Sequence, residues 1–420
     1  MKIYLERKFV ITVSIILLAL SNIGLANDWP QWRGPDRDGI IKEQVLLEAL
    51  PESLNLQWKA EVGKGYGSPV VSGERIYLLT RKGENELVGC YKLANGEVIW
   101  QQEYPAPFKV NQYAVKFGKG PFSTPILHEG MLYTLGIGGI LSCFDAASGE
   151  LKWRNSFSEK PLDTSHFFVG TAMSPLIEDG ICFIHLGEEN SGKLLALDAK
   201  TGEEKWRWEG DKPGYASPIA ATLGGVRQII TLSQTSCLGI DIENGKLLWQ
   251  IPYASEWKEN IITPLIYNEK VIYSGVNRGT SALQLKEMEN EWATMPAWHN
   301  DDITMYMSTP VLLDGKIYGL SHTSKGQFFC MDAETGETDW LSAGRQGQNA
   351  AVVAAGDCII ALTTNADMIV FKQGPQAFEL VRQYSVAESA TWAYPILLKN
   401  QIIIKDEQSL LMWGIGRNEF

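Results

Sequence analysis

Residues 144–153, FDAASGELKW, contain the pattern that decides the fold, and the chain repeats this pattern. Each full copy has an apolar residue, Asp, Gly four positions after the Asp, and Trp four positions after the Gly. Gly supplies the positive φ of a tight turn, and Asp can accept hydrogen bonds from the backbone ahead of it. Each copy therefore predicts a β-hairpin whose outgoing strand carries an indole. The other copies are 197–206 (LDAKTGEEKW), 240–249 (IDIENGKLLW), 331–340 (MDAETGETDW) and the shorter 93–100 (LANGEVIW), which has Lys92 in place of the Asp.

The tryptophans recur at a period of about 40 to 50 residues, which is typical of propeller blades. A second marker, Ser or Thr followed by Pro, precedes each hairpin and begins a strand, a Gly-containing turn and a second strand. Pro is tolerated at the first residue of a strand, where its missing N–H costs little. With two degenerate copies included, we expect structural docking of the indoles of Trp58, Trp100, Trp153, Trp206, Trp249, Trp292 and Trp340.

One repeating unit thus has four strands, and eight unit starts can be counted between Ser68 and Tyr394. The last unit has too few residues for its fourth strand, whereas residues 54–62 form an unassigned strand that carries Trp58. We predict an all-β fold, an eight-bladed β-propeller of four-stranded antiparallel blades. The N-terminal strand 54–62 joins the last blade and closes the ring without an exposed sheet edge. Seven blades with an irregular tail is the alternative.

Three segments make up the predicted domain organisation. Residues 1–26 have the basic start, short apolar stretch and small residues of a signal peptide; an uncleaved anchor is the alternative. Residues 27–53 are a lead-in segment whose indoles we expect to dock on the ring. The alternative is that its Arg and Trp side chains form a platform for a ligand. Residues 54–420 are a single propeller domain. We expect an exported protein, periplasmic or secreted, with no membrane span after signal cleavage and, because no Cys lies near the cleavage site, no lipid attached there.

Charge and cysteine usage limit the partners and the redox chemistry. The chain has a net charge of −12, and removal of residues 1–26, which carry +2, leaves −14. An acidic surface repels phosphate backbones, so we expect no nucleic-acid partner. We also expect the protein to be a monomer. Cysteines at equivalent repeat positions lie in different blades, beyond the roughly 7 Å Cα separation that a disulfide allows. We therefore expect buried free thiols.

The Ser/Thr-Pro starts and the Asp–Gly–Trp hairpins resemble the PQQ-like (pyrroloquinoline-quinone repeat) β-propeller family over about residues 54–416. Such repeats occur in quinoprotein alcohol dehydrogenases and in the propeller lipoprotein of the outer-membrane β-barrel assembly machine. The resemblance implies indoles that dock between blades. It implies nothing about catalysis, because the shared motif is structural.

The links between blades and the turns between second and third strands should share one face of the ring, where ligands usually meet a propeller. Four aromatic residues stand two residues before strand starts: Tyr66, Tyr215, Tyr306 and Trp392. We therefore expect these four side chains to surround the channel mouth. The alternative is that they are packing residues that plug the channel. The predicted ligand or partner face comprises Lys64, Tyr66, Tyr113, His166, Tyr215, His299, Asp301, Asp302, Tyr306, Asn349 and Trp392.

Two classes of function remain open. The first, which we favour, is a non-catalytic binding or scaffold module for a protein or small polar ligand, with no catalytic residue, cofactor or metal. The second is an oxidoreductase dependent on PQQ and calcium, for which residues 299–302 (HNDD) offer hard oxygen ligands. The resemblance implies a vicinal disulfide in many such enzymes, and this chain has no two adjacent cysteines.

Overall fold

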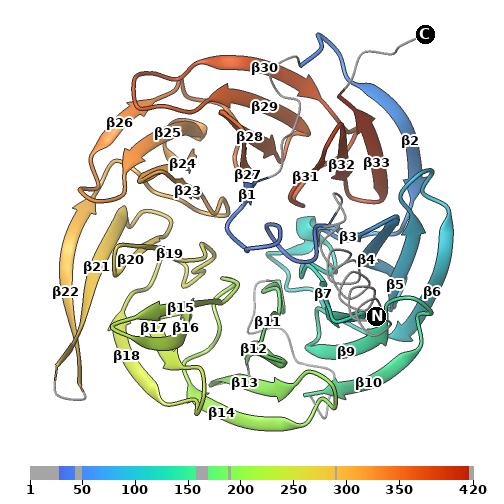
Figure 1. The fold of residues 1–420 in the computed structure, drawn as a ribbon, viewed down its shortest axis with the longest axis horizontal. Helices are drawn as coiled ribbons and strands as arrows, with labels where there is room; N and C mark the ends of the chain where they lie inside the picture. The colour runs from blue at the N-terminus through green and yellow to red at the C-terminus, as the bar shows by residue number, and fades with distance from the viewer. Residues whose placement is uncertain (1–27, 43–49, 158–168, 188–190, 289–290, 416–420) are drawn as a thin grey trace, which may run out of the picture.

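The computed structural model describes residues 28–42, 50–157, 169–187, 191–288 and 291–415, and shows eight β-sheets arranged as blades around a central axis (Figure 1). Seven sheets have four strands, and the eighth has one additional strand. The prediction of an all-β, eight-bladed propeller is confirmed, and the seven-bladed alternative is wrong. In the described residues, helix is limited to the short 3-10 turns η1 (Val115–Phe117) and η3 (Thr323–Lys325). No helix within these ranges is long and apolar enough to cross a membrane.

Each blade is an antiparallel sheet that runs from the central channel outward. Blade 1 consists of β3 (Val70–Ser72), β4 (Arg75–Lys82), β5 (Asn85–Lys92) and β6 (Val98–Pro105), and blade 2 of β7 (Ile126–His128), β8 (Met131–Leu135), β9 (Ile140–Asp145) and β10 (Leu151–Ser156). Blade 3 consists of β11 (Leu176–Glu178), β12 (Ile181–Gly187), β13 (Gly192–Asp198) and β14 (Glu204–Gly210), and blade 4 of β15 (Ile219–Leu223), β16 (Val226–Leu232), β17 (Ser236–Asp241) and β18 (Leu247–Pro252).

Blades 5 to 8 follow the same order, with two exceptions that involve the N-terminal part of the chain. Blade 5 consists of β19 (Leu265–Tyr267), β20 (Lys270–Ser274), β21 (Thr280–Met288) and β22 (Glu291–Asn300), and blade 6 of β23 (Val311–Leu313), β24 (Lys316–Ser321), β25 (Gln327–Asp332) and β26 (Thr338–Leu341). Blade 7 consists of β27 (Ala350–Ala355), β28 (Cys358–Thr363), β29 (Asp367–Lys372) and β30 (Leu380–Ser385), with β1 (Ile40–Ile41) added. Blade 8 consists of β31 (Ile396–Leu398), β32 (Gln401–Lys405), β33 (Ser409–Gly414) and β2 (Asn55–Glu61).

The two middle strands of a blade are buried because a neighbouring blade packs on each of their faces. All six residues of β28 are buried, whereas β30, the outermost strand of the same blade, is largely exposed. This arrangement explains why the middle strands read as continuous apolar runs rather than as alternating patterns.

The ring closes where the predicted N-terminal strand completes the last blade. β2 pairs antiparallel with β33, from Asn55 opposite Gly414 to Glu61 opposite Ser409. The Val62 N–H continues this ladder by donating to the Gln408 carbonyl at 2.9 Å. Because β2 is the outermost strand of blade 8, the two ends of the propeller domain are joined by backbone hydrogen bonds.

A chain of hydrogen bonds near the axis links the first strands of successive blades. At four of the six Ser/Thr-Pro starts, and at Tyr394, the backbone N–H donates to a hydroxyl of the next blade, which gives the Ser or Thr of the marker a physical role. Ala350 N instead donates to Ser308 of the preceding blade. The bonds are Ser68 N to Thr124 Oγ1 (3.1 Å), Thr124 N to Ser174 Oγ (2.9 Å), Ser174 N to Ser217 Oγ (2.9 Å), Thr263 N to Thr309 Oγ1 (3.3 Å), Ala350 N to Ser308 Oγ (2.9 Å) and Tyr394 N to Ser68 Oγ (2.8 Å).

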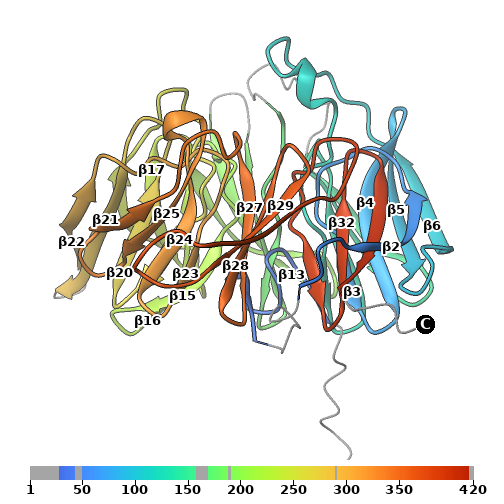
Figure 2. The same cartoon turned by 90° about the horizontal axis from the view of Figure 1, so that it is seen from above.

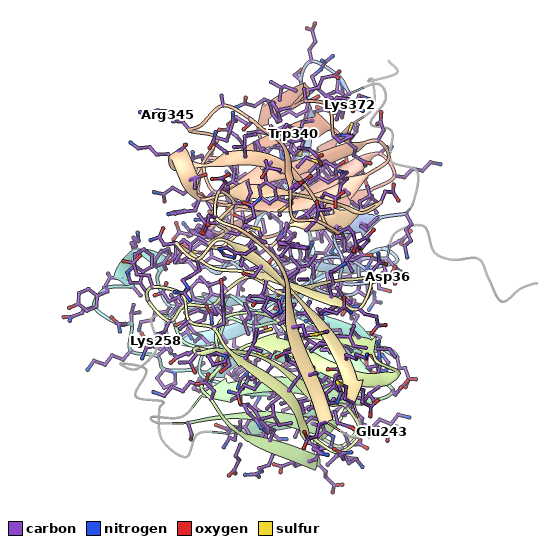
Figure 3. The ribbon with its side chains drawn as sticks, turned by 90° about the vertical axis from the view of Figure 1, so that its left-hand side faces the viewer. Asp36, Glu243, Lys258, Trp340, Arg345 and Lys372 are labelled. Carbon is purple, nitrogen blue, oxygen red and sulfur yellow. The ribbon has the colours of Figure 1, made fainter. Side chains whose placement is uncertain are left out.

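The propeller has two different faces. We call the link face the one formed by the inter-blade links and the turns between second and third strands, such as residues 106–122 and 253–262. The turn face carries the remaining turns, such as 93–97. Figure 2 shows η1 rising above one face, while residues 28–42 lie at the other. In Figure 3, Lys258 and Arg345 project from the link face, and Asp36, Glu243 and Lys372 lie on the turn face.

Residues 28–42 of the lead-in segment cross the turn-face mouth of the channel (Figure 1). Trp29 bridges Val71 in blade 1, and β1 pairs in parallel with β27 in blade 7. The segment therefore joins blades 1 and 7. Residues 1–26, the predicted signal peptide, lie outside the described residues.

Two buried arginines anchor this segment inside the channel. Arg37 donates to the carbonyls of Ser174, Pro175 and Pro218 at 3.0, 2.8 and 3.1 Å, and so joins blades 3 and 4. Arg33 donates to the Pro310 carbonyl of blade 6 at 2.5 Å. Burial, followed by the nearby Arg33 charge, lowers the pKa of Arg37 to about 9. Backbone carbonyl dipoles stabilise both guanidinium groups in place of carboxylates.

The Gly and the Trp of one repeat contact different neighbours. The Trp153 indole Nε1 donates to the Ala199 carbonyl of blade 3 at 3.0 Å, and the same indole covers Gly202. A Cβ added to Gly202 would lie 2.8 Å from that ring, so the turn needs Gly for space as well as for its φ of 74°. The equivalent Nε1 bonds join Trp58 to Leu93 O, Trp100 to Ala146 O, Trp206 to Ile242 O and Trp340 to Gly374 O.

The expected docking positions need correction in blade 5. Its third and fourth strands are longer than those of the other blades, so Trp292 is the second residue of β22 and packs against Gly224 of the preceding blade. The equivalent indole belongs to Trp298, whose Nε1 donates to the Ala333 carbonyl at 3.2 Å. Trp249, one blade earlier, instead donates to Gln228 Oε1 within its own blade at 2.6 Å.

All six cysteines are free and buried, which confirms the expectation from the repeat. Cys90, Cys143 and Cys330 each stand directly opposite a repeat tryptophan in the neighbouring strand. The same position holds Ala196 in blade 3 and Gly239 in blade 4, so a small side chain is what the indole requires.

We expect these thiols to be unreactive in the native protein. Burial raises the pKa of Cys90 to about 11, which leaves little thiolate at pH 8. Ellman's reagent should therefore detect no thiol under native conditions and all six in denaturant. Release of a stoichiometric thiol signal from the native protein within minutes would contradict this burial.

Candidate functional site: an aromatic basin at the channel mouth

The link-face mouth of the channel is a small cavity, which we call the aromatic basin. Its volume is about 160 Å³. Links that precede seven of the eight blades contribute to it, so the ring geometry brings together residues far apart in the chain. The lining residues are Tyr66, Phe117, Phe122, Val169, Ala172, Tyr215, Glu259, Ile261, Met307 and Trp392.

Aromatic rings form much of the wall of the basin. Tyr66 stacks on Phe122 with ring centroids 5.5 Å apart and an interplanar angle of 21°. Trp392 stands edge-on to both Tyr66 and Phe117, at 6.3 and 5.8 Å. These ring-to-ring contacts orient the aromatic side chains that line the cavity.

Glu259 provides the one charge in the described lining of the basin. The Tyr306 hydroxyl donates to its Oε2 at 2.6 Å. Burial raises the pKa of Glu259, although the hydrogen bond from Tyr306 opposes this effect. Within the described residues, no Lys, Arg or His lines the cavity. The basin is thus an apolar pocket with a single acidic group held in place by a tyrosine.

The predicted partner-face residues divide into groups. Tyr66, Tyr215 and Trp392 line the basin, and Tyr306 holds Glu259 at its edge. The structure thus brings together the four aromatic residues that we expected at the channel mouth.

The remaining predicted residues lie elsewhere. Tyr113 is 74% exposed on the link before blade 2, and Lys64 pairs with Glu407 at 3.3 Å. Asn349 is buried and does not line the basin. His166 lies outside the described residues.

The acidic sequence at residues 299–302 does not form part of this site. His299 and Asn300 lie at the end of the outermost strand β22. The exposed His299 contacts Ser281 Oγ at 2.8 Å and Asp301 at 2.8 Å, while the Asn300 amide donates to Gly336 O in blade 6. In the described parts of the chain, no group of three His, Cys, Asp or Glu side chains is arranged to hold a metal. The predicted calcium ligands are therefore not brought together.

Glu259, the one charged residue in the described lining of the basin, was not predicted from the sequence. Its position four residues before Thr263-Pro264 places it at the end of a link, but this link is short and carries no motif. Trp257, 53% exposed and in edge-on contact with Tyr306 at 5.8 Å, was missed for the same reason.

A larger hollow of about 470 Å³ lies on the turn face beside the lead-in segment. Its charged groups already have partners in the protein. Arg33 and Arg37 bind carbonyls, Lys42 pairs with Asp36, and Arg227 pairs with Glu178. We therefore regard the aromatic basin as the better candidate site.

The basin does not fit PQQ with calcium. PQQ carries three carboxylates, whereas the one charge in the described lining is itself negative. Calcium takes six to eight oxygen ligands, and a cofactor site usually offers at least about 300 Å³. The aromatic basin has about half that volume and few oxygen donors. These residues therefore support no step of quinone chemistry.

Fold and site together define a PQQ-like repeat propeller with an apolar, acidic pocket at one end of its channel. Residues 84–342 match the family described as "Outer membrane protein assembly factor BamB", and the chain belongs to this family. BamB of Moranella endobia is 27% identical over 249 residues, which cover 59% of this chain and 55% of the relative. BamB of Yersinia pestis is 21% identical over 406 residues, which cover 89% and 82%. The match thus spans little more than half the length of the Moranella relative.

Solved structures show the same fold at low sequence identity. BamB from Moraxella catarrhalis superposes with a TM-score of 0.59 and 14% identity, covering 86% of this chain and 99% of that one. Quinohemoprotein alcohol dehydrogenase from Comamonas testosteroni gives a TM-score of 0.66 and 12% identity, covering 94% and 81%. At such identities these similarities establish the architecture alone.

Proposed function

We propose that the protein is an exported, non-catalytic propeller that binds a protein partner on its link face and acts in outer-membrane protein assembly. The family match and the names of the relatives support this role. We place the protein in the periplasm for the same reason. The aromatic basin supports binding rather than catalysis, because its described lining offers a single acidic group and no basic residue.

The observation that carries the proposal is a set of exposed apolar side chains on the link face. Tyr113 is 74% exposed, Val115 is 65% exposed and Trp257 is 53% exposed. Trp257 contacts Tyr306 at the edge of the basin, and Phe117, two residues after Val115, lines it. Large apolar side chains exposed together around a pocket are typical of protein interaction sites.

Site-specific photocrosslinking in the native host tests the proposal. A photoreactive phenylalanine analogue at Tyr113 or Trp257 should crosslink to a component of the outer-membrane assembly machinery, identified by mass spectrometry. The same analogue at Leu380, which is 52% exposed on the outermost strand of blade 7, serves as the matched control and should give no such product. Equal crosslinking from all three positions, or none from the link face, would overturn the proposal.

A further inference from the structure

We propose that the aromatic basin binds the guanidinium group of an arginine side chain presented by the protein partner. This inference rests on the proposed function, because it names what the partner inserts. The pocket is chemically specific in a way that a general apolar contact surface is not.

The walls of the aromatic basin suit a flat cation. Tyr66, Phe122 and Trp392 present fixed aromatic surfaces, and a guanidinium group stacks on such rings as well as being attracted to their faces. One of the basin rings already attracts a cation, since the ammonium Nζ of the neighbouring Lys116 lies 4.8 Å from the centroid of the Phe117 ring. Lys116 itself does not line the cavity.

Glu259 gives the basin its preference for a positive charge. Tyr306 donates to Oε2, and no basic group among the described residues forms an ion pair with this carboxylate. The surrounding apolar wall disfavours the ionised form, as its raised pKa shows. An entering cation offsets this cost, because a half-buried carboxylate gains a charge-assisted hydrogen bond.

The size of the cavity favours a side chain over a larger ligand. Its volume of about 160 Å³ is close to the roughly 150 Å³ of an engineered cavity that holds one benzene molecule. A guanidinium group with part of its methylene stem fills such a space. The exposed Tyr113 and Trp257 extend the apolar surface beyond the basin, as expected where the rest of a protein partner would lie.

Binding of a model compound tests the chemistry directly. We would titrate N-acetyl-arginine methylamide, and its neutral isostere N-acetyl-citrulline methylamide, into the full-length protein and follow ligand NMR signals. The arginine compound should bind at least tenfold more tightly. In E259Q the two affinities should come within twofold, whereas the control E256Q, on the same link with an exposed carboxylate that accepts from Asn277, should behave as wild type. Equal denaturation midpoints would show that both variants are folded.

A second experiment asks whether the partner uses the basin. In the strain that carries the photoreactive residue at position 113, E259K should lower the yield of the identified crosslink at least tenfold, and E256K should not. The crosslinked partner peptide should adjoin an arginine whose replacement by glutamine has the same effect.

The outcomes separate the two proposals. If the crosslink forms and E259K leaves its yield unchanged, the arginine inference is wrong and the proposed function stands. If no crosslink to the assembly machinery forms from the link face, the proposed function fails. If the arginine compound binds through Glu259 while the crosslink is insensitive to E259K, the basin is a site for a small cation and the inference is overturned. Equal affinity for the arginine and citrulline compounds also overturns it.

Discussion

Replacement of Arg37 by methionine is expected to lower the free energy of unfolding by about 3–5 kcal/mol, since a buried polar group that loses its partner costs about 1–3 kcal/mol. Arg37 donates to three carbonyls in blades 3 and 4 from a position that is only 6% exposed. Methionine fills a similar volume but leaves those carbonyls without a donor. Chemical denaturation followed by tryptophan fluorescence measures the change.

Lys42, five residues further along the same segment, provides the control. It pairs with Asp36 on the surface, and the two side chains are 70% and 53% exposed. Exposed ion pairs contribute less than about 1 kcal/mol, so Lys42→Ala should leave the denaturation midpoint nearly unchanged. Equal effects of the two substitutions would show that the channel arginines do not anchor the lead-in segment.

Trp340→Ala is expected to destabilise the propeller by about 3–5 kcal/mol, the usual cost of removing a large buried aromatic side chain. Trp340, labelled in Figure 3, is 7% exposed and packs against Tyr318 of its own blade and Phe371 and Phe378 of blade 7. Its Nε1 also donates to the Gly374 carbonyl at 2.8 Å. The substitution therefore removes packing and a hydrogen bond between two blades at once.

Trp257→Ala removes the same side chain from an exposed position. Because Trp257 is 53% exposed on the link face, its loss should change the free energy of unfolding by less than about 0.5 kcal/mol. A destabilisation as large as that of Trp340→Ala would contradict the division between indoles that join blades and indoles that face solvent.

The architecture could be predicted from the sequence because each repeat specifies its own hairpin within about ten residues. The spacing of Gly149 and Trp153 defines one hairpin, and equal spacing elsewhere gives the number of blades. The surplus strand at Trp58 and the missing strand after Tyr394 were enough to predict the closure. The sequence did not show which residues each motif contacts. For example, Gly202 is covered by the Trp153 indole of the preceding repeat.

Features that depend on several blades at once could not be predicted in this way. Nothing in the sequence around Arg37 indicates that carbonyls of Ser174 and Pro218 converge on the channel. Trp298 was missed because the longer strands of blade 5 break the Gly-to-Trp spacing. Tyr66, Tyr215 and Trp392 could be predicted because each stands four residues before the first strand of its blade. In blade 6 Met307, not Tyr306, has that position and lines the basin, and Glu259 has no such offset.

Because β2 pairs with β33, blade 8 can be completed only when both ends of the propeller domain are present. Gln57 and Gln401 are hydrogen-bonded across 344 residues, so contacts of this kind form late and slowly. A polypeptide that leaves a membrane pore with its amino end first can assemble one blade after another during transit. Its β2 strand nevertheless stays unpaired until the last segment of the chain has emerged. During that time a chaperone, a protease or a second incompletely folded copy could bind the unpaired strand.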